Sequence, residues 1–107
     1  MSDYIEERTY YPEGADHDDW NVRLFTVGVY YRGKGKWMVA RQREGHEQLS
    51  QSGKWLYAPS KMNALNWCRF DFETACKLAE RHINTVTVMN MTWSEHEERM
   101  RERGGGV

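Results

Sequence analysis

The chain has no long apolar run, and this absence argues against a membrane-spanning protein. Crossing a bilayer as a helix takes about 20 consecutive apolar residues, and no stretch of the 107-residue sequence approaches that length. The N-terminal stretch MSDYIEERTYY is acidic and has no apolar core, so it does not have the form of a secretory signal. The sequence therefore predicts a cytoplasmic protein that does not enter a membrane.

Cysteine is also scarce, with only Cys68 and Cys76. Neither has a second C-x-x-C pair or a histidine at ligand spacing, which excludes the usual pattern of a structural zinc site. The cluster Asp16-His17-Asp18-Asp19 lacks the glycine turn and the distal glutamate of a calcium loop. We therefore expect two reduced, packed thiols, a solvated acidic turn, no metal and no cofactor.

Recognisable catalytic groupings are missing too. None of the serines has the frame of a nucleophile elbow, and the four histidines are scattered along the chain. The stretch Gly33-Lys34-Gly35-Lys36 contains a GK pair, but it lacks the rest of the phosphate-binding loop pattern. We expect a protein that is not an enzyme.

Aromatic residues, in contrast, are abundant, and the charges are distributed unevenly. Five Trp, six Tyr and three Phe give one domain enough apolar surface to form a core. Residues 1–20 carry seven acids and one base, residues 21–69 nine bases and two acids, and residues 70–107 seven acids and five bases. An acidic segment thus precedes a basic, aromatic-rich body.

The clearest structural pattern is an amphipathic helix from Phe72 to Ile83. Asp71 is placed to cap its start, and Asn84 is placed to end it in the left-handed conformation. We expect the apolar face of this helix to pack against a sheet. That face has apolar residues at helical spacing: Phe72, Ala75, Cys76, Ala79 and Ile83.

The sequence around this helix predicts a small antiparallel sheet of three to five strands. The strongest strand signal covers residues 22–31, and a glycine-containing turn leads to a returning strand over residues 36–43. A polar loop over residues 44–53 leads to a short strand at 54–57. A further strand is expected at 85–91, after the helix.

The predicted fold is therefore α+β, with one domain over residues 21–91. Residues 1–20 are expected to form an irregular acidic arm, and residues 92–107 a short charged helix with a flexible glycine tail. Residues 61–65 are ambiguous, and one helical turn there would precede an extended piece over residues 66–70.

The C-terminal helix is expected to begin at a capping box formed by Ser94 and Glu97. Ion pairs four residues apart, Glu95 with Arg99 and Glu97 with Arg101, should support it.

One hairpin combines cations with aromatic rings and is the candidate binding site. Its bases suit phosphates, and exposed rings suit stacking on nucleic-acid bases. The alternative is that the cations protect an edge strand while the rings pack inward, and the acidic overall balance favours this alternative. The candidate residues are Tyr31, Arg32, Lys34, Lys36, Trp37, Arg41 and Arg43.

A macromolecular partner is expected, and a protein more than a nucleic acid. Tyr, Trp, Met and Arg are common here and are enriched at protein interfaces. We further hypothesise that the acidic segment 1–20 folds onto the basic hairpin and masks it. The oligomeric state stays open.

Two resemblances add expectations. The order of strands and a helix start near the pattern F-x-[ST]-x-x-A, with Phe72, Thr74 and Ala75, resembles the arm-binding domains of phage integrases, which implies a sheet that enters the DNA major groove. The Trp-rich body with the FDFETACKLAERH helix, over residues 22–90, is similar to small accessory proteins of tailed bacteriophages. That resemblance implies modulation of a host protein in the host cytoplasm.

Overall fold

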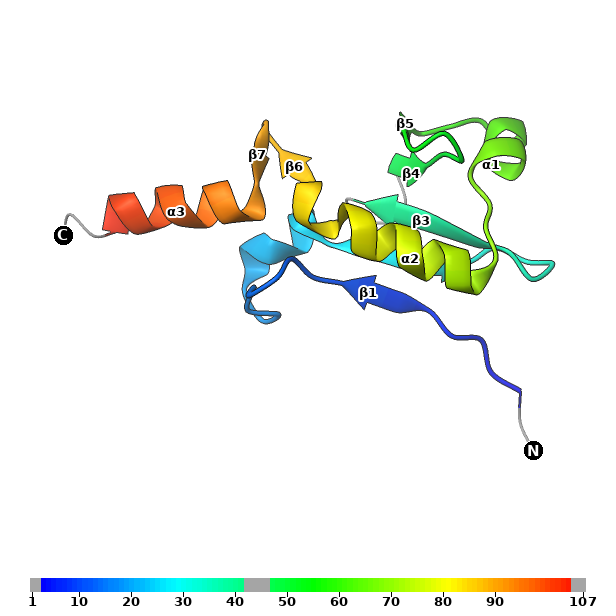
Figure 1. Ribbon diagram of the computed structural model, residues 1–107, viewed down its shortest axis with the longest axis horizontal. Helices are drawn as coiled ribbons and strands as arrows, with labels where there is room; N and C mark the ends of the chain where they lie inside the picture. Colours follow the sequence, from blue (N-terminus) through cyan, green and yellow to red (C-terminus); the bar gives the residue numbers. More distant parts are fainter. Residues whose placement is uncertain (1–2, 42–46, 105–107) are drawn as a thin grey trace.

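Five antiparallel strands form one sheet in the computed structural model, which describes residues 3–41 and 47–104 (Figure 1). Neighbouring strands follow one another along the chain, in the order β1-β2-β3-β4-β5. The α+β class and the upper end of the expected strand number are confirmed. The strands are β1 (Arg8–Tyr10), β2 (Val27–Tyr31), β3 (Trp37–Arg41), β4 (Glu47–Leu49) and β5 (Trp55–Tyr57).

The predicted main helix is present as α2 (Phe72–His82) and lies across one face of the sheet (Figure 1). Its start is capped as expected, because the Asp71 carboxylate accepts the Thr74 N–H at 2.8 Å. Ala75 and Ala79 are fully buried. The residues that pack with them to form the core include Val27, Val29, Val39, Leu49, Phe70, Cys76, Ile83 and Val86.

The end of this helix differs from the prediction. The chain continues into a 3-10 turn, η2 (Ile83–Thr85), and Asn84 does not take the left-handed conformation. The Asn84 side chain instead accepts the backbone N–H of Glu13 at 2.9 Å. A long-range hydrogen bond to the N-terminal segment therefore takes the place of the local helix cap.

The N-terminal segment is not irregular throughout, so the predicted arm is wrong at Arg8–Tyr10. These residues form β1, which is antiparallel to β2 and places Tyr10 opposite Val27. The pairing is extended by the Glu7 carboxylate, which accepts the Tyr31 N–H at 2.9 Å. Because β2 needs a partner on this side, the segment completes the sheet.

The first part of the strand predicted over residues 22–31 is also wrong. A 3-10 helix, η1 (Trp20–Phe25), occupies it, and β2 begins only at Val27. The Asp19 carboxylate caps this helix by accepting the Asn21 N–H at 2.9 Å. Local capping and burial of Phe25 in a second apolar cluster override the strand propensity of the sequence.

The middle of the chain holds two elements that the sequence did not define. β4 lies inside the loop predicted over 44–53, while residues 42–46 lie outside the described part. The undecided stretch is a helix, α1 (Lys61–Trp67), capped by the Ser60 hydroxyl, which accepts the Asn63 N–H at 3.1 Å. The extended piece expected over 66–70 is reduced to a bridge between Phe70 and Trp37.

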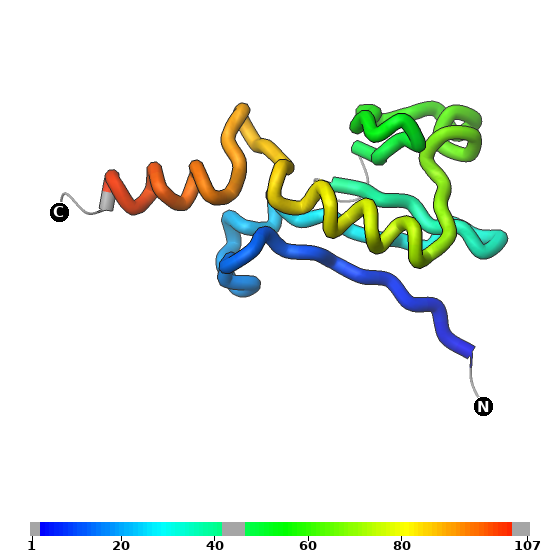
Figure 2. The backbone as a smooth tube through the Cα atoms, in the orientation of Figure 1, coloured from blue at the N-terminus to red at the C-terminus, as the bar shows by residue number. Residues whose placement is uncertain are grey.

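The strand predicted at 85–91 is a two-stranded hairpin outside the main sheet, made by β6 (Thr87–Val88) and β7 (Met91–Thr92). The prediction failed because Met89 and Asn90 both have positive φ, 52° and 65°, and reverse the chain between two very short strands. The hairpin leads directly into α3 (Trp93–Gly104), which runs away from the sheet (Figure 2).

The capping box of α3 is real, but it lies two residues earlier than predicted. The Thr92 hydroxyl accepts the Glu95 N–H at 3.3 Å, and the Glu95 carboxylate accepts the Thr92 N–H at 3.1 Å. Glu95 is therefore engaged at the cap and no ion pair to Arg99 is observed, while the Glu97–Arg101 pair is confirmed at 3.3 Å.

Candidate binding site

The turn between β2 and β3 provides the first three cations of the site. The Arg32 N–H donates to the Lys36 carbonyl at 2.8 Å, and the Lys36 N–H donates to the Gly33 carbonyl at 3.0 Å. Between them Lys34 has a φ of 55°, a conformation that costs a non-glycine residue about 1–2 kcal/mol. The turn therefore holds a lysine in a strained position, where glycine would be relaxed.

Arg69 provides the fourth cation, from the connection between α1 and α2. Its Nη1 donates to the Gln48 side-chain oxygen at 3.1 Å and to the Cys68 carbonyl at 3.0 Å. Burial lowers the pKa of the Arg69 guanidinium, and the nearby positive charge of Arg32 acts in the same direction. The group still carries its charge at physiological pH, because the ordinary pKa of arginine is far higher.

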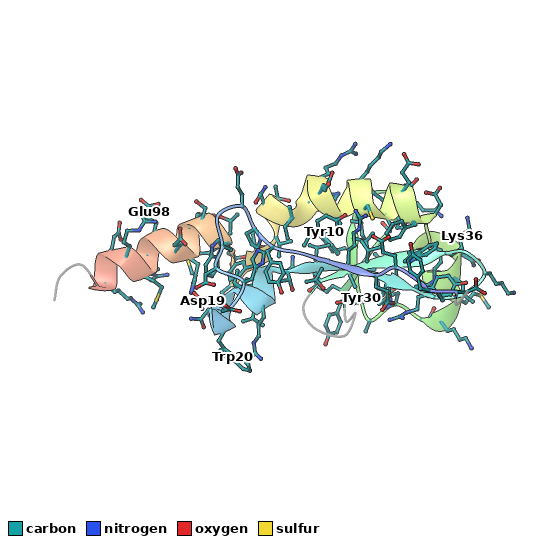
Figure 3. The ribbon with its side chains drawn as sticks, turned by 90° about the horizontal axis from the view of Figure 1, so that it is seen from below. Tyr10, Asp19, Trp20, Tyr30, Lys36 and Glu98 are labelled. Atoms are coloured by element: carbon teal, nitrogen blue, oxygen red, sulfur yellow. The ribbon has the colours of Figure 1, made fainter. Side chains whose placement is uncertain are left out.

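These cations line one open pocket of about 530 Å³. Among the residues that the structure describes, no acidic one lines it. Within residues 3–41 and 47–104, none of the four cations has a carboxylate in ion-pair contact. Figure 3 places Lys36 near one end of the molecule and Glu98 of α3 near the other, with Asp19 and Trp20 between them. The lining residues are Arg32, Gly33, Lys34, Lys36, Gln51, Leu65 and Arg69.

Leu65 of α1 lines the basic pocket, and two further apolar side chains of this helix are exposed. Met62 is 71 % exposed, Leu65 54 % and Trp67 51 %, so three large apolar groups of one short helix face solvent. The helix is fixed beside the pocket because the Gln51 N–H donates to the Trp67 carbonyl at 2.7 Å. A second hollow of about 390 Å³ shares Gln51 with the first and is lined by Ser50, Ser52, Leu56 and Trp67 as well.

The aromatic residues predicted for this site are directed toward the protein itself. The rings of Tyr31 and Trp37 lie 4.9 Å apart, and Trp37 lies 5.1 Å from the ring of Phe72. The Trp37 indole N–H donates to the Glu6 carbonyl at 2.9 Å. Both rings are half-buried in these contacts, so they are not placed as free stacking surfaces.

Arg41 does not belong to the pocket. It is 9 % exposed, and its Nε lies 3.2 Å from the Glu47 carboxylate. Its Nη2 donates to the Thr87 carbonyl, and its guanidinium lies 5.7 Å from the centre of the Trp55 ring. Arg41 therefore joins the sheet to the C-terminal hairpin. Arg43, the last predicted residue, lies outside the described residues.

The N-terminal segment contacts the hairpin in a different way from the masking hypothesis. Its Glu6 carbonyl and Glu7 carboxylate bind N–H groups of Trp37 and Tyr31, and Glu6 forms its ion pair with Arg8 at 2.7 Å. No ion pair joins residues 3–20 to the pocket cations within the described parts of the chain. Masking of the pocket stays a prediction.

Sequence reasoning missed Arg69, Gln51 and Leu65. Arg69 belongs to the basic segment, which is the only sequence signal for it. No spacing rule connects it to the hairpin, because α1 and two strands separate them in the chain. Only the folded chain brings these residues together.

Other site types have less support. Among the described residues, no group of three or more His, Cys, Asp or Glu side chains is placed to hold a metal ion. Cys68 and Cys76 are both buried, and burial raises the pKa of the Cys68 thiol. In the same part of the chain, no helix has the length and apolar character needed to cross a membrane.

The basic pocket and the exposed face of α1 are therefore the features from which a function can be argued. No family model matches the chain, and neither a curated protein nor a solved structure matches it significantly.

Proposed function

We propose that the protein is a non-enzymatic binding module that docks a partner protein through the basic pocket and the adjoining face of α1. The observation that carries this proposal is a pocket lined by four cations, unpaired with any described carboxylate, and by the exposed apolar side chain of Leu65, with the exposed Met62 three residues earlier on α1. An acidic segment of a partner that also carries apolar residues matches both parts. Arginine, methionine and tryptophan are enriched at protein interfaces.

A protein partner fits this surface better than a nucleic acid. The hairpin rings Tyr31 and Trp37 are engaged within the chain. The exposed residues next to the pocket include the aliphatic side chains of Met62 and Leu65, which bury well against protein side chains. α1 itself has only one charged residue, Lys61, whereas a phosphate-tracking surface would continue the line of cations.

The biological setting that we propose is that of a phage-type accessory protein that binds and modulates a host protein in the host cytoplasm. The support for it is the overall similarity in composition and element order described above, together with a surface suited to protein contact. Modulation without catalysis requires only that the docked partner is held or blocked.

The test is affinity capture from a lysate of the cognate cell, followed by titration of the purified partner. A Lys34→Glu/Leu65→Asp variant should lose the partner, because it changes both exposed parts of the surface. Arg81→Glu is the matched control, since Arg81 is an exposed cation on α2 outside the pocket. Equal capture by all three proteins, each shown to be folded by circular dichroism, would contradict the proposal.

One observation favours nucleic acid as a second candidate. Trp67 is half-exposed and lines the hollow beside the cations, so a base stacked on it would place its phosphate near the basic pocket. Titration with single-stranded oligonucleotides at several salt concentrations tests this. Tight binding with a steep salt dependence, weakened by Trp67→Ala, would support it. Absence of binding at low salt would exclude it.

A further inference from the structure

The two arginines of the basic pocket are held by neutral groups. The Arg69 guanidinium is fixed by an amide oxygen and a backbone carbonyl, and Arg32 donates to the Tyr31 carbonyl at 2.9 Å. The acceptors of both guanidinium groups are thus uncharged, so these hydrogen bonds position the two arginines without neutralising their positive charge.

The charge of the pocket points to an anion with more than one negative charge. Arg32, Lys34, Lys36 and Arg69 line it without an acidic neighbour in the lining. A carboxylate brings one charge and two oxygens. A phosphoryl group brings close to two charges at neutral pH and three acceptor oxygens, and arginine forks match its geometry.

We propose that the pocket is a phosphoryl-binding site that receives a phosphorylated side chain of the partner protein. The inference rests on the proposed function and specifies its chemistry. Arg69 is held in place by the Gln48 side chain and the Cys68 carbonyl. Arg69 and Arg32 contact the phosphoryl oxygens, while Lys34 and Lys36 of the turn add positive charge. Leu65 and the exposed face of α1 receive apolar residues that flank the modified side chain.

The volume and position of the pocket suit this ligand. At about 530 Å³ the space exceeds what a phosphate ion alone occupies, so it also admits the side chain that carries the group. Its wall changes from cationic on the turn side to apolar at Leu65, over the width of one pocket. A free phosphate shares the phosphoryl chemistry but leaves the apolar wall at Leu65 without a matching group.

The experiment measures binding of four probes to the full chain by calorimetry. They are inorganic phosphate, a peptide with one phosphoserine flanked by leucines, its unphosphorylated form, and an oligothymidylate. The phosphopeptide is expected to bind at least about tenfold more tightly than the unphosphorylated form, because charged hydrogen bonds carry the difference. It should also bind more tightly than inorganic phosphate, which lacks the apolar flank.

The matched variants are Arg69→Gln in the pocket and Arg81→Gln on the exposed surface of α2. Arg69→Gln should weaken phosphopeptide binding about tenfold or more, and Arg81→Gln should leave it unchanged. If Arg69→Gln proves unfolded by circular dichroism, Lys34→Gln on the exposed turn is the second test, because Lys34 is exposed and glutamine meets the same backbone conformation as lysine. Phosphopeptide binding unaffected by the folded pocket variants overturns the inference.

The failure of this inference is distinguishable from failure of the proposed function. If the captured partner still needs Lys34 and Leu65 but binds equally well after phosphatase treatment, the phosphoryl site is wrong and the docking surface remains. If inorganic phosphate binds as tightly as the phosphopeptide, the apolar flank plays no part and the partner-protein source is wrong. If oligothymidylate is the tightest ligand, the nucleic-acid alternative replaces the inference.

Discussion

Gly28 shows, at the scale of single residues, that a side chain can be excluded by a neighbour rather than by backbone conformation. It lies in β2 and is buried, and the ring of Tyr30 occupies the space that a Cβ would enter. Gly28 does not have positive φ, so the requirement for glycine is one of space. The two residues lie on the same face of the strand, as residues two apart do.

Gly28→Ala should therefore destabilise the domain by about 1–2 kcal/mol, because the Tyr30 ring has to move away. Urea unfolding measures the change. The Gly28→Ala/Tyr30→Ser double variant removes the obstructing ring and is the control. The double variant should lose less unfolding free energy than the two single variants together. Strictly additive losses of unfolding free energy would show that the Tyr30 ring is not the cause.

Asp71 gives a residue-scale prediction for pH. The N–H of Thr74 stabilises the carboxylate and holds the pKa of Asp71 below its ordinary value. Because the folded-state pKa is depressed, this stabilisation is present above the ordinary pKa of about 4 and is lost as the pH falls through the folded-state value. Asp71→Ala should lower the Tm by a few degrees at pH 7.

At low pH, the Tm of the same variant should differ little from that of the wild type, because the Asp71 carboxylate is then protonated in both the folded and the unfolded chain. Thermal unfolding followed by circular dichroism between pH 7 and pH 2.5 measures the difference. A loss in Tm that is as large at low pH as at pH 7 would show that the cap does not act through the carboxylate charge.

Among the elements, the start of α2 was predictable to the residue and β3 and β5 were predictable closely, whereas η1 and β1 were not. Asp71 and the apolar spacing of α2 are local signals. The 3-10 helix η1 depends on the Asp19 cap and on burial of Phe25 against Trp93, a residue from the far end of the chain. β1 is short and polar, so only its pairing with β2 identifies it as a strand.

The buried face of α2 carries the next prediction. Ala79→Asp should unfold the domain, with a loss of about 3 kcal/mol or more, because Ala79 is fully buried against the sheet and the new charge has no partner. Lys77→Asp on the exposed face of the same helix is the control and should cost far less. Chemical denaturation of both variants decides, and similar midpoints would show that the assigned face is wrong.

The start of α3 gives a prediction in which two neighbouring residues are compared. Thr92→Ala removes the hydroxyl that accepts the Glu95 N–H, so the first turn of α3 should fray, at a local cost of about 1 kcal/mol. Ser94→Ala, one residue inside the helix, should have little effect. Amide hydrogen exchange of the first turn measures the difference, and equal protection in both variants would contradict the observed capping box.

At the scale of the whole molecule, the fold class followed from the sequence, but the site did not. Periodicity and turn residues indicate a helix on an antiparallel sheet, and the structure has both. The basic pocket needs Arg69 brought beside the β2–β3 turn, and this placement depends on the packing of α1 and on the Gln48 contact. Arg41 was misassigned because burial beside Glu47 cannot be read from its position on a basic strand.

The two ends of the molecule differ in a way that matters for handling the protein. The β2–β3 turn and the described start of the chain lie at one end of the long axis, and α3 leads to the other (Figure 1). A biosensor chip, resin or fluorophore attached beyond α3 therefore leaves the basic pocket facing the solution. The described start of the chain lies at the same end as the β2–β3 turn, so attachment beyond α3 is the choice that keeps the surface away from this end.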